Sequence, residues 1–163
     1  MLLEALVAAA VLSGPAATKI ERCAPVTEAE VAALFDRWNA SLATSDPDKV
    51  IANYAPDAIL LPTVSNLPRF TQQERRAYFV DFLKNRPNGR IDERRIQIGC
   101  NTAVDAGLYT FTMEATGAVV QARFTYTYVK HGDAWLISSH HSSMMPERPL
   151  AALDPAGPSP PAR

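Results

Sequence analysis

Two adjacent histidines, His140 and His141, are the side chains of this sequence best suited to acid–base or ligand-binding chemistry near neutral pH. They belong to the run Trp-Leu-Ile-Ser-Ser-His-His-Ser-Ser, whose composition is typical of a β-strand. Adjacent residues of a regular strand point to opposite faces, so the two imidazoles cannot chelate one ion. No cysteine lies at zinc-ligand spacing from them either, and we expect neither a metal nor a cofactor.

The turns around this strand predict its register. A two-residue loop at Gly132-Asp133 places Lys130 opposite Trp135. Counting back along both strands then pairs Tyr128 with Ile137, Tyr126 with Ser139 and Phe124 with His141. If Thr116-Gly117 closes the preceding hairpin, the pairs there are Tyr109 with Phe124, Phe111 with Ala122 and Met113 with Val120.

This register predicts an antiparallel sheet with one apolar face and one solvated face, because side chains alternate along each strand. The apolar face contains Tyr109, Phe111, Met113, Phe124, Tyr126, Tyr128, Trp135, Ile137 and His141. The solvated face contains Thr110, Thr112, Arg123, Thr125, Thr127, Ser138, His140 and Ser142. A shift of one residue would exchange the two faces, so the assignment of His141 to the apolar face is testable.

Three helices are predicted to cover the apolar face. A capping box at Thr27–Glu30 opens the first, which carries an apolar stripe from Val31 to Leu42. Asp46-Pro47 opens a shorter helix that we expect to continue through Tyr54 to residue 57, before a strand over 58–61. A second capping box at 71–74 opens the third helix, which ends near Asn85. Pro87-Asn88-Gly89 reads as a turn before a strand over 91–100.

Length and charge restrict the class of protein. A chain of 163 residues with 47% hydrophobic residues can bury the core of one domain. The net charge of −1, without a run of Lys or Arg, argues against a dedicated nucleic-acid binder. No apolar segment is long enough to span a bilayer.

The first 22 residues contain a short apolar run followed by small residues, as in a secretory signal, although no basic residue precedes the run. An N-terminal helix is the alternative. In an exported domain, Cys23 and Cys100 would form one disulfide, whereas in a cytoplasmic protein they would be two buried thiols. We expect a secreted or periplasmic protein, with a cytoplasmic location as the alternative. Residues 23–147 are the expected domain, and 148–163 a Pro-rich disordered tail.

The order of these elements resembles the nuclear-transport-factor-2-like, or SnoaL-like, cone fold, an α+β fold with N-terminal helices packed on a strongly curved, mostly antiparallel sheet. Residues 128–143, with a charged turn, a Trp-Leu pair and a His-containing strand, resemble the closing hairpin of the association (hub) domain of calcium/calmodulin-dependent kinase II. Residues 57–62 and 76–83 fit the same pattern. The resemblance covers Val26 to Pro146 and indicates a stand-alone bacterial relative, since no kinase domain is present.

The resemblance implies self-assembly, as a homodimer or a ring of dimers, and a pocket for a small molecule on the covered sheet face. We expect that pocket to be lined by Tyr54, Tyr109, Tyr126, Trp135 and His141, with Arg69 at its rim. Arg123, on the solvated face, is the weaker candidate for holding an anion.

Three roles are open for His141: a core residue, a ligand-binding residue, or the acid or base of an enzyme acting on a polyketide- or steroid-like substrate. Ketosteroid isomerase, an enzyme of this fold, has its base Asp just before the Pro that ends the first strand. Leu60-Leu61 precede Pro62 here, which argues against that chemistry. The sequence therefore favours an oligomerising, ligand-binding domain over an enzyme.

Overall fold

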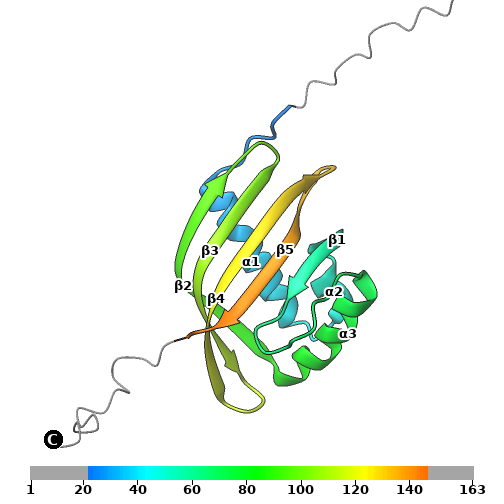
Figure 1. Cartoon of the computed structure of the whole chain (residues 1–163), viewed down its shortest axis with the longest axis vertical. Coiled ribbons are helices and arrows are strands. Elements are labelled where there is room, and N and C mark those ends of the chain that lie inside the picture. The colour runs from blue at the N-terminus through cyan, green and yellow to red at the C-terminus, as the bar shows by residue number, and fades with distance from the viewer. Residues whose placement is uncertain (1–21, 147–163) are drawn as a thin grey trace, which may run out of the picture.

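The computed structural model describes residues 22–146, which form three α-helices, a short 3₁₀ helix and a five-stranded sheet (Figure 1). The predicted signal segment (residues 1–22) and Pro-rich tail (residues 148–163) lie outside the described residues, apart from Arg22. The α+β architecture, with N-terminal helices on a curved and mostly antiparallel sheet, is the predicted one. Within 22–146, no helix combines the length and the apolar character needed to cross a membrane.

The two long helices begin at the predicted capping boxes. Helix α1, Glu28–Leu42, starts where the Thr27 hydroxyl accepts from the Glu30 amide at 3.2 Å and the Glu30 carboxylate accepts from the Thr27 amide at 2.8 Å. The same exchange between Thr71 and Glu74 starts α3, Gln72–Phe82, which continues as the 3₁₀ turn Leu83–Asn85. Each box satisfies amide groups that have no partner within the helix. The apolar stripe of α1 is buried against the sheet.

Two predicted boundaries are wrong. Helix α2, Pro47–Ile51, ends earlier than expected, because the Asn53 side-chain amide donates to the carbonyls of Lys49 and Val50, both at 3.1 Å. Strand β1, Tyr54–Leu61, starts directly afterwards. The expected turn at 87–89 is instead the beginning of strand β2, Pro87–Ile98, an edge strand on which proline is tolerated.

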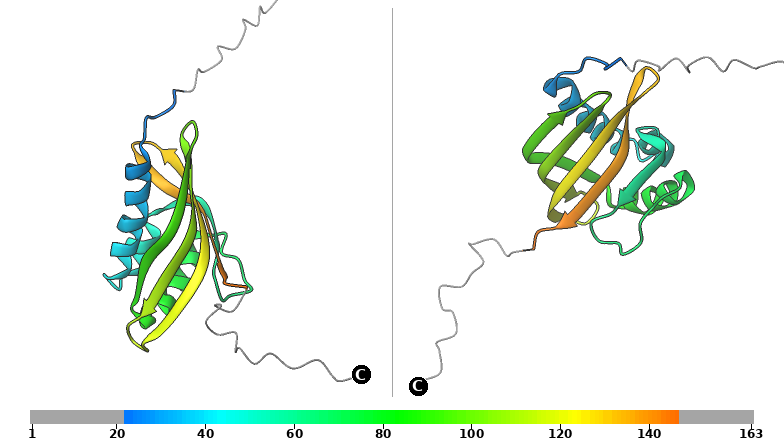
Figure 2. Two further views of the ribbon diagram at one scale, coloured as in Figure 1. Left: turned by 90° about the vertical axis from the view of Figure 1, so that its left-hand side faces the viewer. Right: turned by 45° about the horizontal axis from the view of Figure 1, so that its top comes forward.

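The remaining strands are β3 (Thr102–Met113), β4 (Ala118–His131) and β5 (Ala134–Met144), and the sheet order is β1-β5-β4-β3-β2. Among the five strands of the described chain, β1 pairs in parallel with β5, and the other three pairs are antiparallel. In Figure 2 the sheet curves, α1 runs along one of its faces, and the opposite face carries no helix. We call these the covered face and the open face.

A β-bulge at Ser138 changes the predicted register of β5. Lys130 lies opposite Trp135 and Tyr128 opposite Ile137, as expected. Beyond that point Ser139 pairs with Thr127, so Ser138 is an extra residue, and its hydroxyl donates to the Thr127 carbonyl at 3.1 Å. Tyr126 then faces His140 and Phe124 faces Ser142. The prediction that His141 belongs to the covered face is therefore wrong: His140 and Ser142 are buried there, and His141 is exposed.

The register of the β3–β4 hairpin is shifted by two residues from the predicted register, whereas the bulge shifts β5 by one. Tyr109 pairs with Ala122, Phe111 with Val120 and Met113 with Ala118, around a four-residue loop that includes Gly117 at φ 74°. Because side chains alternate with period two, this shift leaves every residue of the hairpin on its predicted face.

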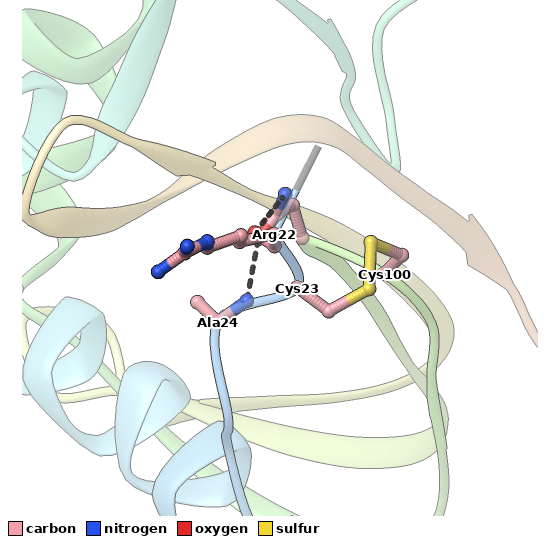
Figure 3. Close-up of a disulfide and its surroundings, with 5 residues drawn as sticks. Arg22, Cys23, Ala24 and Cys100 are labelled. Atoms are coloured by element: carbon pink, nitrogen blue, oxygen red, sulfur yellow. Dashed lines mark hydrogen bonds between the residues drawn. A yellow bond between two sulfur atoms is a disulfide. The ribbon is translucent and has the colours of Figure 1, made fainter. Parts of the chain in front are cut away.

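A disulfide joins Cys23, ahead of α1, to Cys100, after β2 (Figure 3). Asn101 reinforces this connection. Its side chain accepts from the Ala24 amide at 2.7 Å and donates to the Arg22 carbonyl at 3.2 Å. The predicted pairing is thus present, and it favours an oxidising compartment, where disulfides form and persist.

Asp105 of β3 is a carboxylate buried under α1. It is fully inaccessible to solvent, and its partner is Arg94 of β2, with Nη2 and Oδ2 3.2 Å apart. Burial raises the pKa of Asp105 to about 6, which the positive charge of Arg94 opposes only in part. Ionised Asp105 therefore destabilises the folded state at neutral pH.

Replacing Asp105 with Asn should remove this destabilisation in a pH-dependent way. Above pH 6 the wild type carries the full cost of a buried carboxylate, whereas between pH 6 and 4 its folded state takes up a proton first and the cost disappears. We expect the stability of Asp105→Asn relative to wild type to be about 2 kcal/mol more favourable at pH 8 than at pH 4. Urea unfolding of both proteins at several pH values measures this, and a difference independent of pH would contradict it.

Candidate functional site

A pocket of about 510 Å³ lies on the covered face of the sheet, between α3 and strands β3, β4 and β5. Its walls are mainly aromatic and aliphatic, with Trp38 from α1, Leu60 from β1 and Phe79 from α3 among the lining residues. Such a concave apolar site with a few polar groups is the usual form of a small-molecule site. The few polar groups of such a lining fix the orientation of a bound molecule.

Three hydroxyl groups meet at this pocket. The Tyr109 hydroxyl donates to Ser142 Oγ at 2.5 Å, and Ser142 Oγ also makes a short hydrogen bond with Thr63 Oγ1. These side chains come from β3, from β5 and from the loop after β1, so only the fold brings them together. Burial raises the pKa of Tyr109 to about 12, which keeps its hydroxyl protonated and able to donate at neutral pH.

His140 contributes a neutral imidazole beside this hydroxyl cluster (Thr63, Tyr109 and Ser142). Its Nδ1 lies 2.9 Å from the Tyr54 hydroxyl, and its ring stacks on Tyr126 with the ring centroids 4.1 Å apart. Burial, with a smaller contribution from the charge of His141, lowers the pKa of His140 to about 3. The imidazole is uncharged near neutral pH, and Nε2 has no hydrogen-bond partner among the described residues.

Arg69 is one of the residues that line the pocket. Its guanidinium donates to the Leu67 carbonyl at 2.5 Å and to Ser65 Oγ at 3.2 Å, and lies 5.8 Å from the centre of the Tyr78 ring. These contacts hold the charge in the loop over 62–70, so the pocket lining includes one arginine.

Of the six predicted ligand-binding residues, Arg69 and Tyr109 line the pocket. Tyr54 and Tyr126 are buried and do not line the pocket; Tyr54 shares a hydrogen bond with His140, and Tyr126 stacks on its ring. Trp135 lies near the β4–β5 turn, where its carbonyl accepts from Arg37 at 2.7 Å, and it does not line the pocket. His141 is on the open face, paired with Thr125 and Leu61.

Sequence reasoning missed Thr63, His140 and Ser142. The two β5 residues were assigned to the solvated face because the bulge at Ser138 has no signature in the sequence. The only available signal was their spacing of two, which always places both on the same face. Among residues 22–146, no group of three or more His, Cys, Asp or Glu side chains could hold a metal ion.

Comparisons with known proteins agree with this architecture. The family model for the calcium/calmodulin dependent protein kinase II association domain matches residues 27–146. A solved association-domain structure from Xanthomonas campestris is 46% identical, covers 80% of this chain and 100% of its own, and superposes with a TM-score of 0.71. Among curated proteins, no sequence matches the chain.

More distant solved structures share the fold alone. An iota-carbonic anhydrase from a cyanobacterium, solved with bicarbonate, is 22% identical, with 76% of this chain and 94% of that chain covered and a TM-score of 0.67. A protein of the NTF2-like family from Streptomyces avermitilis is 11% identical, with 71% of this chain and 93% of that chain covered and a TM-score of 0.64. The match over 27–146 and the identity to the Xanthomonas structure place this chain in the calcium/calmodulin-dependent protein kinase II association domain family.

Proposed function

We propose that this protein is a self-assembling domain, exported from the cytoplasm, whose pocket binds a small ligand through oxygen atoms. The observation that carries the binding role is the hydroxyl cluster together with His140, whose buried Nε2 has no hydrogen-bond partner among residues 22–146, at a pocket that is otherwise mainly apolar. A ligand with acceptor oxygens at one end loses hydrogen bonds when it leaves water. It would form new ones with these polar side chains. Export is supported by the Cys23–Cys100 disulfide.

Self-assembly is supported by the family and by the character of the open face. Ile59 and Leu61 of β1 are 40% and 38% exposed on that face and lie beside Ser139 and His141 of β5, which in turn pair with the half-buried Thr127 and Thr125 of β4. Apolar and uncharged side chains grouped on an exposed sheet are suited to packing against a second copy. We propose a homodimer, or a ring of such dimers, that uses this face.

Leu61→Lys should weaken that assembly, because a charge would have to be desolvated between the two sheets. We expect light scattering of the full chain to give the mass of a dimer or a multiple of it for the wild type, and a smaller mass for the variant. Val80→Lys is the matched control, since Val80 is 41% exposed but lies on α3. Equal masses for all three proteins would exclude the open face as the interface.

A second candidate function is the interconversion of carbon dioxide and bicarbonate in the same pocket. It is favoured by the fold shared with the iota-carbonic anhydrase solved with bicarbonate, and by apolar walls suited to carbon dioxide around hydroxyls suited to bicarbonate oxygens. In hydration, the water oxygen bonds to the carbon and one C=O electron pair moves onto its oxygen. The water proton then passes to a base in solution.

In that reaction the residues of this chain would stabilise charge rather than hold a proton. Hydroxyls already positioned at the pocket can donate to the oxygen that becomes negative. His140, with its pKa near 3, is too weak a base to keep a proton at neutral pH. The alternative enzyme, with His141 as acid or base on a polyketide- or steroid-like substrate, lacks support because His141 is exposed on the open face.

Ser142→Ala tests both the binding role and the candidate reaction. Ser142 joins the other two hydroxyls, so its loss should weaken bicarbonate binding by about tenfold. Binding is measured by line broadening of ¹³C-bicarbonate, and turnover by exchange of ¹⁸O from labelled bicarbonate into water.

Ser143→Ala is the matched control. Ser143 is the next residue of β5 but contacts Arg123 on the open face, with Nε and Oγ 3.1 Å apart, and its loss should change neither measurement. Wild-type protein that binds bicarbonate without exchange activity would support the ligand-binding role alone. Identical behaviour of the two serine variants would refute the proposed site.

A further inference from the structure

Trp38, Tyr54 and His140 form a chain of hydrogen bonds behind the pocket. Trp38 Nε1 donates to the Tyr54 hydroxyl oxygen at 3.1 Å, and that oxygen lies 2.9 Å from His140 Nδ1. The three side chains come from α1, β1 and β5, and all are almost completely buried. The chain ends on a residue that lines the pocket.

The direction of these hydrogen bonds follows from the indole. An indole N–H can only donate, so the Tyr54 oxygen accepts from Trp38. Burial raises the pKa of Tyr54 well above its usual value, so the phenol keeps its own proton. The remaining neighbour of that hydroxyl is His140 Nδ1, and a proton donated there requires Nδ1 to be the unprotonated ring nitrogen.

The opposite arrangement would leave two buried polar groups without partners, whereas hydrogen on Nε2 leaves one. If Nδ1 carried the hydrogen and donated to Tyr54, the phenol oxygen would accept twice, and neither its own O–H nor the unprotonated Nε2 would have a partner among the described residues. With hydrogen on Nε2 only that N–H lacks a partner, and it belongs to a residue that lines the pocket. Unpaired buried donors are costly, because the hydrogen bond to water lost on folding is not replaced. Burial also disfavours the imidazolium, in which both nitrogens carry hydrogen.

From this network we infer that His140 is fixed as the neutral tautomer with hydrogen on Nε2, and that this N–H is a permanent donor to the ligand of the pocket. The inference rests on the proposed ligand-binding function and assigns the ligand a chemistry. The atom that meets Nε2 must be an acceptor oxygen, as in bicarbonate or a carboxylate. A ligand presenting an N–H or an ammonium group there would oppose donor to donor and be rejected.

The surroundings of the imidazole keep it in place for this role. Tyr126 stacks on one side of the ring at 4.1 Å, and Trp38 meets it edge-on at 5.4 Å between centroids. Ser142, two residues further along β5, presents its hydroxyl on the same face. His140 and Ser142 thus place two polar side chains from one strand at the pocket. Tyr54 acts through His140 and is a positioning residue.

The tautomer can be read directly from the ¹⁵N shifts of the histidine ring in the full-length protein. Its signals are assigned with His131→Gln and His141→Gln, two exposed positions. We expect Nδ1 of His140 to resonate as an unprotonated, hydrogen-bonded nitrogen and Nε2 as a protonated one at neutral pH. A protonated Nδ1 in the wild type would overturn the inference without any core substitution.

Tyr54→Phe and Tyr126→Phe separate the network from general packing. Both remove a buried hydroxyl from a tyrosine that contacts His140. The Tyr54 hydroxyl is hydrogen-bonded to His140, whereas the Tyr126 hydroxyl has no hydrogen-bond partner among the described residues. We expect Tyr54→Phe to give a mixture of tautomers and about tenfold weaker bicarbonate binding, and Tyr126→Phe to retain the wild-type tautomer and affinity.

The outcomes distinguish this inference from the function on which it rests. If the wild type binds bicarbonate and Tyr54→Phe binds it equally well, the donor role of His140 is overturned and the proposed function stands. If the wild type shows the expected tautomer but binds neither bicarbonate nor acetate, both the donor role and the ligand class fail.

Discussion

Replacing both Cys23 and Cys100 with serine should lower the free energy of unfolding by about 4 kcal/mol. The disulfide closes a loop with a sequence separation of 77, and in the chain-entropy account the cross-link restricts the unfolded chain by that amount. In the folded state it anchors the segment that enters α1 to the end of β2 (Figure 3). Its loss therefore affects the unfolded ensemble and the docking of the first helix.

Urea unfolding of the wild type with and without reductant provides the measurement. Reduced wild-type protein should unfold at the lower urea concentration of the double-serine variant, and the variant should not respond to reductant. Wild type with the same stability in both conditions would mean that the bond contributes nothing, for instance because the arm at 22–26 is held by Asn101 alone.

Arg75→Met should destabilise the protein by about 3 kcal/mol, although no carboxylate within residues 22–146 forms an ion pair with Arg75. Its guanidinium is buried and donates to four backbone carbonyls: those of Ala55 and Phe70 at 3.1 Å, Pro56 at 2.8 Å, and Ala58 through a short hydrogen bond. Methionine fills similar space but leaves these carbonyls unpaired, each at a cost of about 1–3 kcal/mol before water enters. Arg75 thus links α3, which carries Phe79, to β1, which carries Tyr54.

Arg76→Met is the control for this experiment. Arg76 is the next residue of α3 and forms an ion pair with Asp48 at 2.8 Å, but its side chain is 47% exposed. Exposed ion pairs contribute about 0–1 kcal/mol, so this variant should remain close to wild type. If chemical unfolding gives the two variants the same stability, the carbonyl contacts of Arg75 do not stabilise the fold as argued.

Much of the fold was predictable because its signals are local. The capping boxes at 27–30 and 71–74 and the tight turn at 132–133 each depend on residues close in sequence, and each was confirmed. The last residue of α2 and the first residue of β2 were not predictable in the same way. They depend on the side chain of Asn53 turning back onto α2, and on Pro87 lying at an edge of the sheet.

The candidate site was predicted only in part, for a reason that can be traced to one residue. Arg69 and Tyr109 line the pocket, but the bulge at Ser138 exchanged the faces of every later residue of β5. His141 thereby lost the position expected for it, and His140 and Ser142 took places in the site. A bulge reflects the curvature that strand pairing imposes on a whole sheet, and neither strand alone encodes it.

The sequence by itself determined the family, the helix starts, the cysteine pair and the fact that residues two apart in β5 act on one face. The tertiary structure alone decided which face that is, which hydroxyls meet, and which nitrogen of His140 carries hydrogen. Helix caps and turns are set by hydrogen bonds between near neighbours. The site is set by contacts among α1, β1, β3 and β5, whose geometry exists only once the sheet has curved around its core.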